Sequence, residues 1–104
     1  MIYEYEHADQ KVYFGGKLVG VIYGKSYIAF KEKDKHFFRN FNGYGVSKAI
    51  LEKMKEMKIV NIIFRDEFAE YCISIERLEK EGQVWNNTKD DIQLIMNVDA
   101  CTKI

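Results

Sequence analysis

The fold is decided by residues 47–64, which read SKAILEKMKEMKIVNIIF. In the first part of this stretch, apolar residues recur at helical spacing and charged residues fill the opposite side. Ser47 is placed to cap the first turn, and Lys58 brings a cation to the last turn, where the helix dipole is negative. The pattern predicts an amphipathic helix over residues 47–57. Its buried face is expected to carry Val46, Ala49, Ile50, Met54 and Met57, with Leu51 at the margin.

The second part of the stretch, residues 59–64, is apolar at nearly every position and rich in β-branched side chains. A strand of this kind has to be covered on both faces, because neither face offers polar groups to water. Residues 59–64 are therefore predicted to form a central strand of a sheet, and the preceding helix is expected to cover one face of that sheet.

The remainder of the chain consists of short alternating segments separated by glycines and polar pairs, which is typical of strands and turns. Strands are expected over residues 2–7, 11–14, 18–23, 26–31, 35–41, 68–74 and 92–98. A short helix is expected over residues 75–81, between Ser74 as its cap and Gly82 as its stop, and residues 85–91 are expected to form a loop. The sequence thus predicts one compact α+β domain over residues 1–104. It combines a mainly antiparallel sheet of about six short strands with one main amphipathic helix on one face and a short second helix.

The composition is that of an ordinary globular protein, with 47% hydrophobic and 31% charged residues, and it argues against disorder. No apolar run is long enough to cross a membrane, and the N-terminal residues do not resemble a signal peptide. A soluble cytoplasmic protein without membrane contact is therefore expected. Cys72 and Cys101 are too few for a disulfide framework, and both are expected to be small core residues.

Positive and negative charges balance at 16 each, but they are unevenly distributed along the chain. Residues 31–58 hold eight Lys or Arg against four Asp or Glu, whereas residues 59–104 hold five against nine. The basic middle of the chain favours an anionic partner. The same polarity also suits head-to-tail self-association, and a solvated surface without a partner is the plainest alternative.

Cations alternate with aromatic rings in residues 31–41, KEKDKHFFRNF. Cations neutralise phosphates and rings stack on bases, so this composition is typical of proteins that bind single-stranded nucleic acid. The residues expected to contact nucleic acid are Lys31, Lys33, Lys35, His36, Arg39 and Lys48. In the alternative interpretation, the segment is an edge strand whose lysines discourage aggregation and whose phenylalanines belong to the core.

A glycine-rich segment, NGYGVSK at residues 42–48, leads into the main helix. Free N–H groups at a helix start can hold a phosphate, so Gly43, Gly45 and Ser47 are expected to form an anion-binding loop. The segment departs from the dinucleotide fingerprint and from the Walker pattern, which both require a further glycine near Lys48. Two glycines in an awkward turn, followed by an ordinary serine cap, are the alternative.

Acidic residues suggest a metal-dependent nuclease as a third function, through Asp66, Glu67 and Glu70, or through Glu76 and Glu79 with Lys80. No spacing among them is diagnostic, so no catalytic residue, metal site or cofactor is assigned. The expected function is a small binding domain that contacts nucleic acid through its phosphate backbone. A protein-interaction or self-associating domain without catalysis is the alternative.

Overall fold

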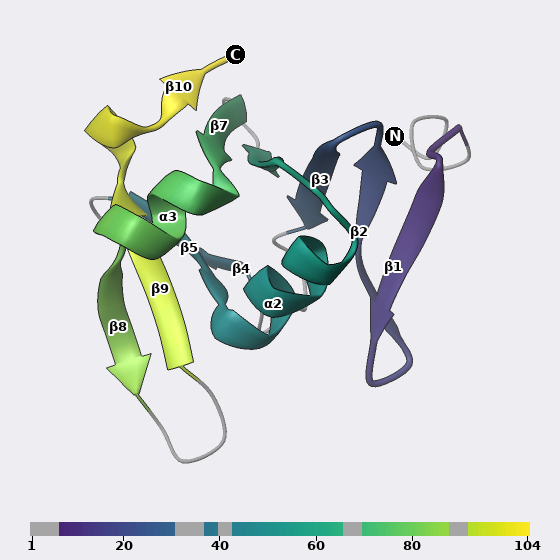
Figure 1. Cartoon of the computed structure of the whole chain (residues 1–104), viewed down its shortest axis with the longest axis horizontal. Coiled ribbons are helices and arrows are strands. Elements are labelled where there is room, and N and C mark those ends of the chain that lie inside the picture. The colour runs from purple at the N-terminus through teal and green to yellow at the C-terminus, as the bar shows by residue number, and fades with distance from the viewer. Residues whose placement is uncertain (1–6, 31–36, 40–42, 66–69, 88–91) are drawn as a thin grey trace.

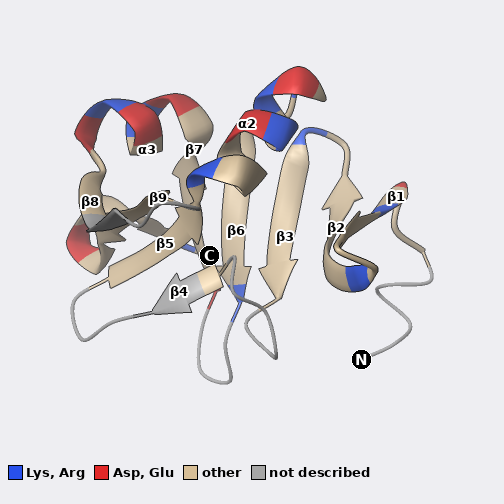
Figure 2. Cartoon of the chain, turned by 90° about the horizontal axis from the view of Figure 1, so that it is seen from below, with Lys and Arg blue, Asp and Glu red and all other residues tan. Residues whose placement is uncertain are grey.

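The computed structural model describes residues 7–30, 37–39, 43–65, 70–87 and 92–104, arranged as two sheets with two helices on the same side of the strands (Figures 1 and 2). The six-stranded sheet has the order β1 (Gln10–Phe14), β2 (Lys17–Tyr23), β3 (Ser26–Phe30), β6 (Asn61–Arg65), β7 (Glu70–Ser74), β10 (Thr102–Lys103). The four-stranded sheet has the order β4 (Phe37–Arg39), β5 (Gly43–Ser47), β9 (Ile92–Asn97), β8 (Gln83–Asn87). The helices are α2 (Lys48–Glu56) and α3 (Ile75–Glu81), followed by the 3₁₀ turn η1 (Val98–Ala100). This confirms the α+β class.

The six-stranded sheet is mixed. β3 and β6 run parallel, whereas β1–β2, β2–β3, β6–β7 and β7–β10 are antiparallel pairs. The chain between β3 and β6 contains β4, β5 and α2, which is the long crossover that a parallel pair requires. β6 therefore lies inside the sheet, as predicted. The second sheet was not anticipated from the sequence.

α2 packs on the core with a face slightly rotated from the expected one. Ile50, Leu51 and Met54 are almost completely buried, while Met57 is half-buried. Ala49 is exposed, so its predicted place on the buried face is wrong. Leu51, expected at the margin, takes that place. A buried face with Ala49 and a buried face with Leu51 both fit the helical period. Leu51 occupies the core because its larger side chain removes more apolar surface from water.

The end of α2 is a Schellman motif. The Ile59 N–H donates to the Met54 carbonyl at 2.9 Å, and the Lys58 N–H donates to the Lys55 carbonyl at 3.1 Å. Lys58 itself has φ 63°, the left-handed conformation in which this motif usually places glycine. Met54 and Ile59, the two positions between which this motif usually has an apolar contact, are both buried in the same core cluster. The chain can therefore turn from helix to strand within a few residues.

β6 is buried on one face and half-buried on the other. Ile62 and Phe64 are completely buried and belong to the core, whereas Ile63 points to the opposite face and is half-buried. The expectation that both faces would be covered is therefore met fully on one face and in part on the other. The helix covers one face, and the apolar residues of the run alternate between the two faces because strand side chains do.

One cluster of buried residues draws on both sheets and both helices. It includes Leu51 from α2, Leu78 from α3, Phe64 from β6 and Met96 from β9. On the outer surface, Lys55 of α2 donates to Glu79 of α3 at 2.9 Å. Charged residues are concentrated along these two helices, and the strands beneath them carry few (Figure 2). The shared cluster explains why α2 and α3 lie side by side over the strands.

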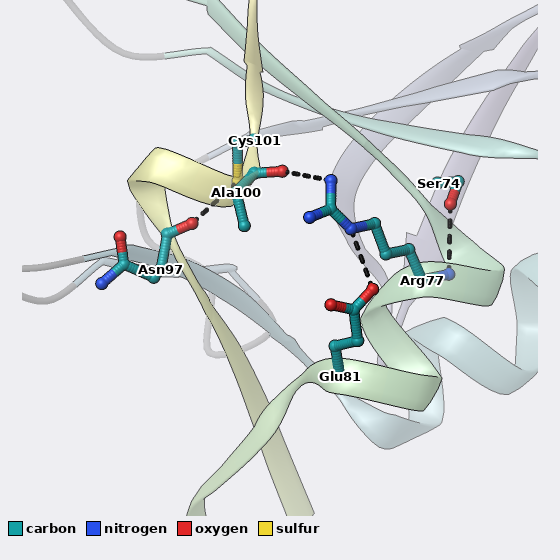
Figure 3. A network of polar contacts seen from close by, with 6 residues as sticks. All are labelled: Ser74, Arg77, Glu81, Asn97, Ala100 and Cys101. Atoms are coloured by element: carbon teal, nitrogen blue, oxygen red, sulfur yellow. Dashed lines mark hydrogen bonds and ion pairs between the residues drawn. The ribbon is translucent and has the colours of Figure 1, made fainter.

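α3 begins and ends where the sequence predicts. The Ser74 hydroxyl accepts a hydrogen bond from the Arg77 N–H at 3.1 Å, and the Gly82 N–H closes the helix on the Leu78 carbonyl. Arg77 then links the helix to the C-terminal segment, donating to the Ala100 carbonyl at 2.7 Å and to Glu81 at 2.9 Å (Figure 3). The same side chain therefore supports α3 and holds η1 beside it.

Several predicted boundaries need correction or fall outside the described ranges. Residues 85–91 were expected to form a loop, but β8 extends to Asn87 and pairs with β9. The predicted first strand lies almost entirely within residues 1–6, which the structure does not describe, and the predicted strand over residues 35–41 is described only as β4. In the described ranges, no helix combines the length and apolar character needed to span a bilayer.

Candidate nucleic-acid interface

The predicted nucleic-acid residues lie mainly outside the described ranges. Lys31, Lys33, Lys35 and His36 belong to residues 31–36, of which the structure describes nothing. Arg39 is the last residue of β4, and Lys48 is the exposed first residue of α2. The structure does describe Phe30 and Phe37, the residues directly before and after residues 31–36. The positions of these two residues show which strands the segment connects.

The segment starts at the carboxyl edge of the parallel pair β3–β6. Phe30, the last residue of β3, lies opposite Arg65, the last residue of β6. Arg65 was not singled out from the sequence, and pattern alone could not have identified it, because its relevance depends on a pairing between strands 35 positions apart.

The segment ends close to the start of α2. Phe37, the first residue of β4, lies opposite Val46 of β5, two residues before Lys48. Residues 31–36 therefore connect a residue paired with Arg65 to a residue paired with Val46.

Arg65 forms an ion pair with Glu70. Its Nε lies 2.5 Å from the Glu70 carboxylate, and both side chains are about one-third exposed or less, at 27% and 32%. An ion pair at this exposure contributes only about 0–1 kcal/mol, because water screens it. Glu70 therefore reduces the positive field of Arg65, whereas Lys48 at the start of α2 is exposed.

The glycine-rich segment is a strand, so the prediction of a loop is wrong. Gly43 and Gly45 lie in β5, every residue of which is buried, with β4 on one side and β9 on the other. A Cβ on Gly43 would overlap the Met96 carbonyl oxygen, and a Cβ on Gly45 would overlap the Leu94 carbonyl oxygen. The two glycines therefore permit the close approach of β5 to β9. Anion binding at these residues stays a prediction, and the geometry gives the glycines a structural role.

Ser47 is the cap that the sequence predicts. Its hydroxyl is completely buried and accepts a hydrogen bond from the Ile50 N–H at 3.4 Å, a long contact. A capping hydroxyl satisfies one of the donors at the start of the helix that would otherwise need water or a ligand. The role of Ser47 as the cap of α2 therefore explains this residue without a bound anion.

One ring of the basic and aromatic segment is part of the core. Phe37 is 4% exposed and packs edge-on against Phe64 at 5.3 Å and against Tyr44 at 6.0 Å. Tyr44 also stacks on Phe64, with centroids 5.2 Å apart and rings 15° from parallel. These rings join the two sheets. Phe37 is thus unavailable for stacking on a base, as the alternative interpretation of the segment expects.

Two of the acids considered for metal-dependent catalysis are held in ion pairs, and two others lie outside the described ranges. Asp66 and Glu67 lie outside the described ranges, Glu70 is paired with Arg65, and Glu79 is paired with Lys55. Among the described residues, no three His, Cys, Asp or Glu side chains come together as metal ligands would. The observed ion pairs account for two of the acids without any metal.

The two cysteines were expected to be core residues, but both are only half-buried. Burial raises the pKa of the Cys72 thiol above its ordinary value. Burial also raises the pKa of Cys101, although the nearby Arg77 guanidinium opposes this. The reactive form of cysteine is the thiolate, and a raised pKa reduces its population at neutral pH. These thiols are therefore poorly suited to nucleophilic chemistry.

Comparison with protein-family models, with curated proteins and with solved structures finds no match to this chain.

Proposed function

We propose that this chain is a binding domain that contacts the phosphate backbone of nucleic acid through residues 31–36, Arg39 and Lys48. One observation supports the proposal: Phe30, which precedes the basic segment, pairs with Arg65 at the carboxyl edge of β3–β6, and Phe37, which follows residues 31–36, pairs with Val46 on the strand that leads into α2. The proposal assigns the lysines of residues 31–36 and the exposed Lys48 to one phosphate-binding surface.

The chemistry of this region suits phosphate rather than base recognition. Lysine ammonium groups act as point charges that replace condensed counterions on the nucleic acid, which requires no particular base sequence. Phe37 is buried, so it cannot contribute the base stacking that would favour particular single-stranded bases. The proposal therefore implies weak sequence preference and strong dependence on salt.

The salt dependence can be estimated from the cations. If Lys31, Lys33, Lys35, Arg39 and Lys48 each contact one phosphate, the slope of log K against log salt concentration is about −4.5 for duplex DNA and about −3.5 for a single strand. A non-specific site of this kind has a dissociation constant of about 10⁻⁴ to 10⁻⁶ M at physiological salt.

The test is a fluorescence-anisotropy titration with labelled single-stranded and duplex DNA and RNA at several salt concentrations. Replacement of the three segment lysines by alanine should abolish binding and flatten the salt dependence. The matched control removes the same amount of charge from exposed positions elsewhere in the fold, through the triple substitution Lys11→Ala, Lys17→Ala and Lys25→Ala. The control should bind like the unmodified chain. Absence of binding to any of these nucleic acids at low salt, or equal losses in the two triple variants, would reject the proposal.

A further inference from the structure

The end of β6 joins the strand that leads into the basic segment to a strand that supplies a carboxylate. Arg65, the last residue of β6, lies directly opposite Glu70, the first residue of β7, and its Nε donates to the Glu70 carboxylate at 2.5 Å. On the other side of β6, Arg65 is paired with Phe30, the residue directly before the basic segment. A cation and a competing anion are therefore fixed on the backbone next to the start of the proposed interface.

The covalent chain keeps the first lysine of the segment near Arg65. Neighbouring Cα atoms are about 3.8 Å apart across a trans peptide, and paired strands lie about 4.8 Å apart. Because Phe30 pairs with Arg65 and is bonded to Lys31, the Cα atoms of Lys31 and Arg65 are within about 9 Å of each other. Two long cationic side chains that start this close together can contact the same stretch of phosphate backbone.

The ion pair between Arg65 and Glu70 is open to exchange. The two side chains are 27% and 32% exposed, and water screens an ion pair that it reaches. A phosphate group offers the guanidinium a geometry that matches its planar fork, so that two parallel hydrogen bonds form. A phosphate that arrives at Arg65 therefore replaces a screened carboxylate with a better acceptor.

We propose that Arg65 is a further phosphate ligand of the interface, and that Glu70 is the anion it exchanges for the nucleic-acid backbone. This inference rests on the proposed function, to which it adds one contact and one competitor. In the unbound chain Glu70 holds the guanidinium, and in the complex a phosphate takes its place while the Glu70 carboxylate returns to water. Glu70 thus weakens binding, and its removal strengthens it.

The first test compares Glu70→Gln with Glu79→Gln by fluorescence anisotropy on a labelled single strand at about 100 mM salt, where exposed charges more than about 10 Å apart are largely screened. Glu70→Gln should bind at least about threefold more tightly, the factor that corresponds to two unit charges about 6 Å apart in water. Glu79→Gln is the matched control, because it removes the same charge and releases Lys55 from an ion pair of 2.9 Å between the two helices. The control should leave the affinity nearly unchanged.

A double-mutant cycle separates exchange at Arg65 from a general effect of charge. Arg65→Gln alone should weaken binding at least about threefold. In the Arg65→Gln background, Glu70→Gln should bring no more than Glu79→Gln does, because no phosphate is then held beside residue 70. A gain from Glu70→Gln that is the same with and without Arg65 would overturn the exchange.

The Nε–H resonance of Arg65 reports the exchange without any change in charge. In an NMR titration with the same single strand, this resonance should shift together with the Lys48 amide, and a Lys48 shift without an Arg65 Nε–H shift would overturn the exchange. Binding in which Glu70→Gln gains no more than Glu79→Gln would also overturn it and leave the proposed function standing. Absence of binding by the unmodified chain at low salt would reject the proposed function, and the exchange with it.

Discussion

The Gly45→Ala substitution separates the strand interpretation of the glycine-rich segment from the loop interpretation. In the structure, the added Cβ would overlap the Leu94 carbonyl oxygen and the Ile95 side chain, and the nearest obstacle is backbone that cannot rotate away. β5 cannot move aside freely, because β4 pairs with it on the other side and its residues are all buried. Overpacking of a core typically costs about 1–3 kcal/mol, and a disturbed strand ladder adds to it, so we expect a loss of at least about 3 kcal/mol in the free energy of unfolding.

For a domain of this size, a loss of about 3 kcal/mol lowers Tm by roughly 12 °C. Urea denaturation followed by circular dichroism measures the free energy directly. The control is Gly15→Ala, where the backbone has φ 57° but an added Cβ meets no atom within 4 Å, so the cost is limited to about 1–2 kcal/mol for left-handed alanine. If Gly45→Ala destabilised the chain no more than Gly15→Ala does, the close packing of β5 against β9 would be refuted. The interpretation of the glycine-rich segment as a loop would then be favoured.

Three further outcomes are expected. Lys58→Gly should raise the free energy of unfolding by about 0.5–1 kcal/mol in urea denaturation, because Lys58 occupies a left-handed position at φ 63° that glycine adopts without strain; a destabilised variant would contradict the Schellman motif. Arg77→Ala should increase hydrogen exchange in β10 while leaving β3 unchanged, since it removes the hydrogen bond to the Ala100 carbonyl; unchanged exchange in β10 would show that Arg77 does not hold the C-terminal segment. Alkylation of Cys72 and Cys101 by iodoacetamide should have a higher pH midpoint in the folded chain than in urea, because burial raises both pKa values. For the same reason, the contribution of each thiol to the free energy of unfolding is present below the ordinary pKa and is lost as pH rises through the raised pKa of the folded chain. An alkylation midpoint that is the same in the folded and unfolded chain would contradict the burial of the thiols.

The sequence alone was sufficient to predict the features of the fold that depend on neighbouring residues in the chain. The caps of α2 and α3 at Ser47 and Ser74 follow from a serine directly before a periodic apolar pattern, and both are present. The central position of β6 follows from an apolar run that cannot face water. These features need no knowledge of distant residues, which is why a single sequence was sufficient to predict them.

The features that were missed depend on contacts between distant parts of the chain. A glycine in a strand and a glycine in a loop look alike in sequence, and the role of Gly45 is set by Leu94, which lies 49 positions later. β8 is polar enough to suggest a loop, and it is a strand because β9 supplies its hydrogen bonds. The same limit applies to the candidate interface, where the neighbourhood of Arg65 and residue 30 is created by strand pairing and has no local signal.

The most direct test of the proposed function is an NMR titration of the isotopically labelled chain with a single-stranded oligonucleotide at low salt. The proposal predicts that amide resonances of Phe37, Lys48 and Arg65 shift, because Phe37 follows residues 31–36, Arg65 pairs with Phe30, which precedes them, and Lys48 belongs to the proposed interface. It also predicts that resonances of β1 and β8 remain in place and that the shifts disappear as salt increases. Shifts confined to β1 or β8, or a spectrum that does not change on addition of nucleic acid, would contradict it.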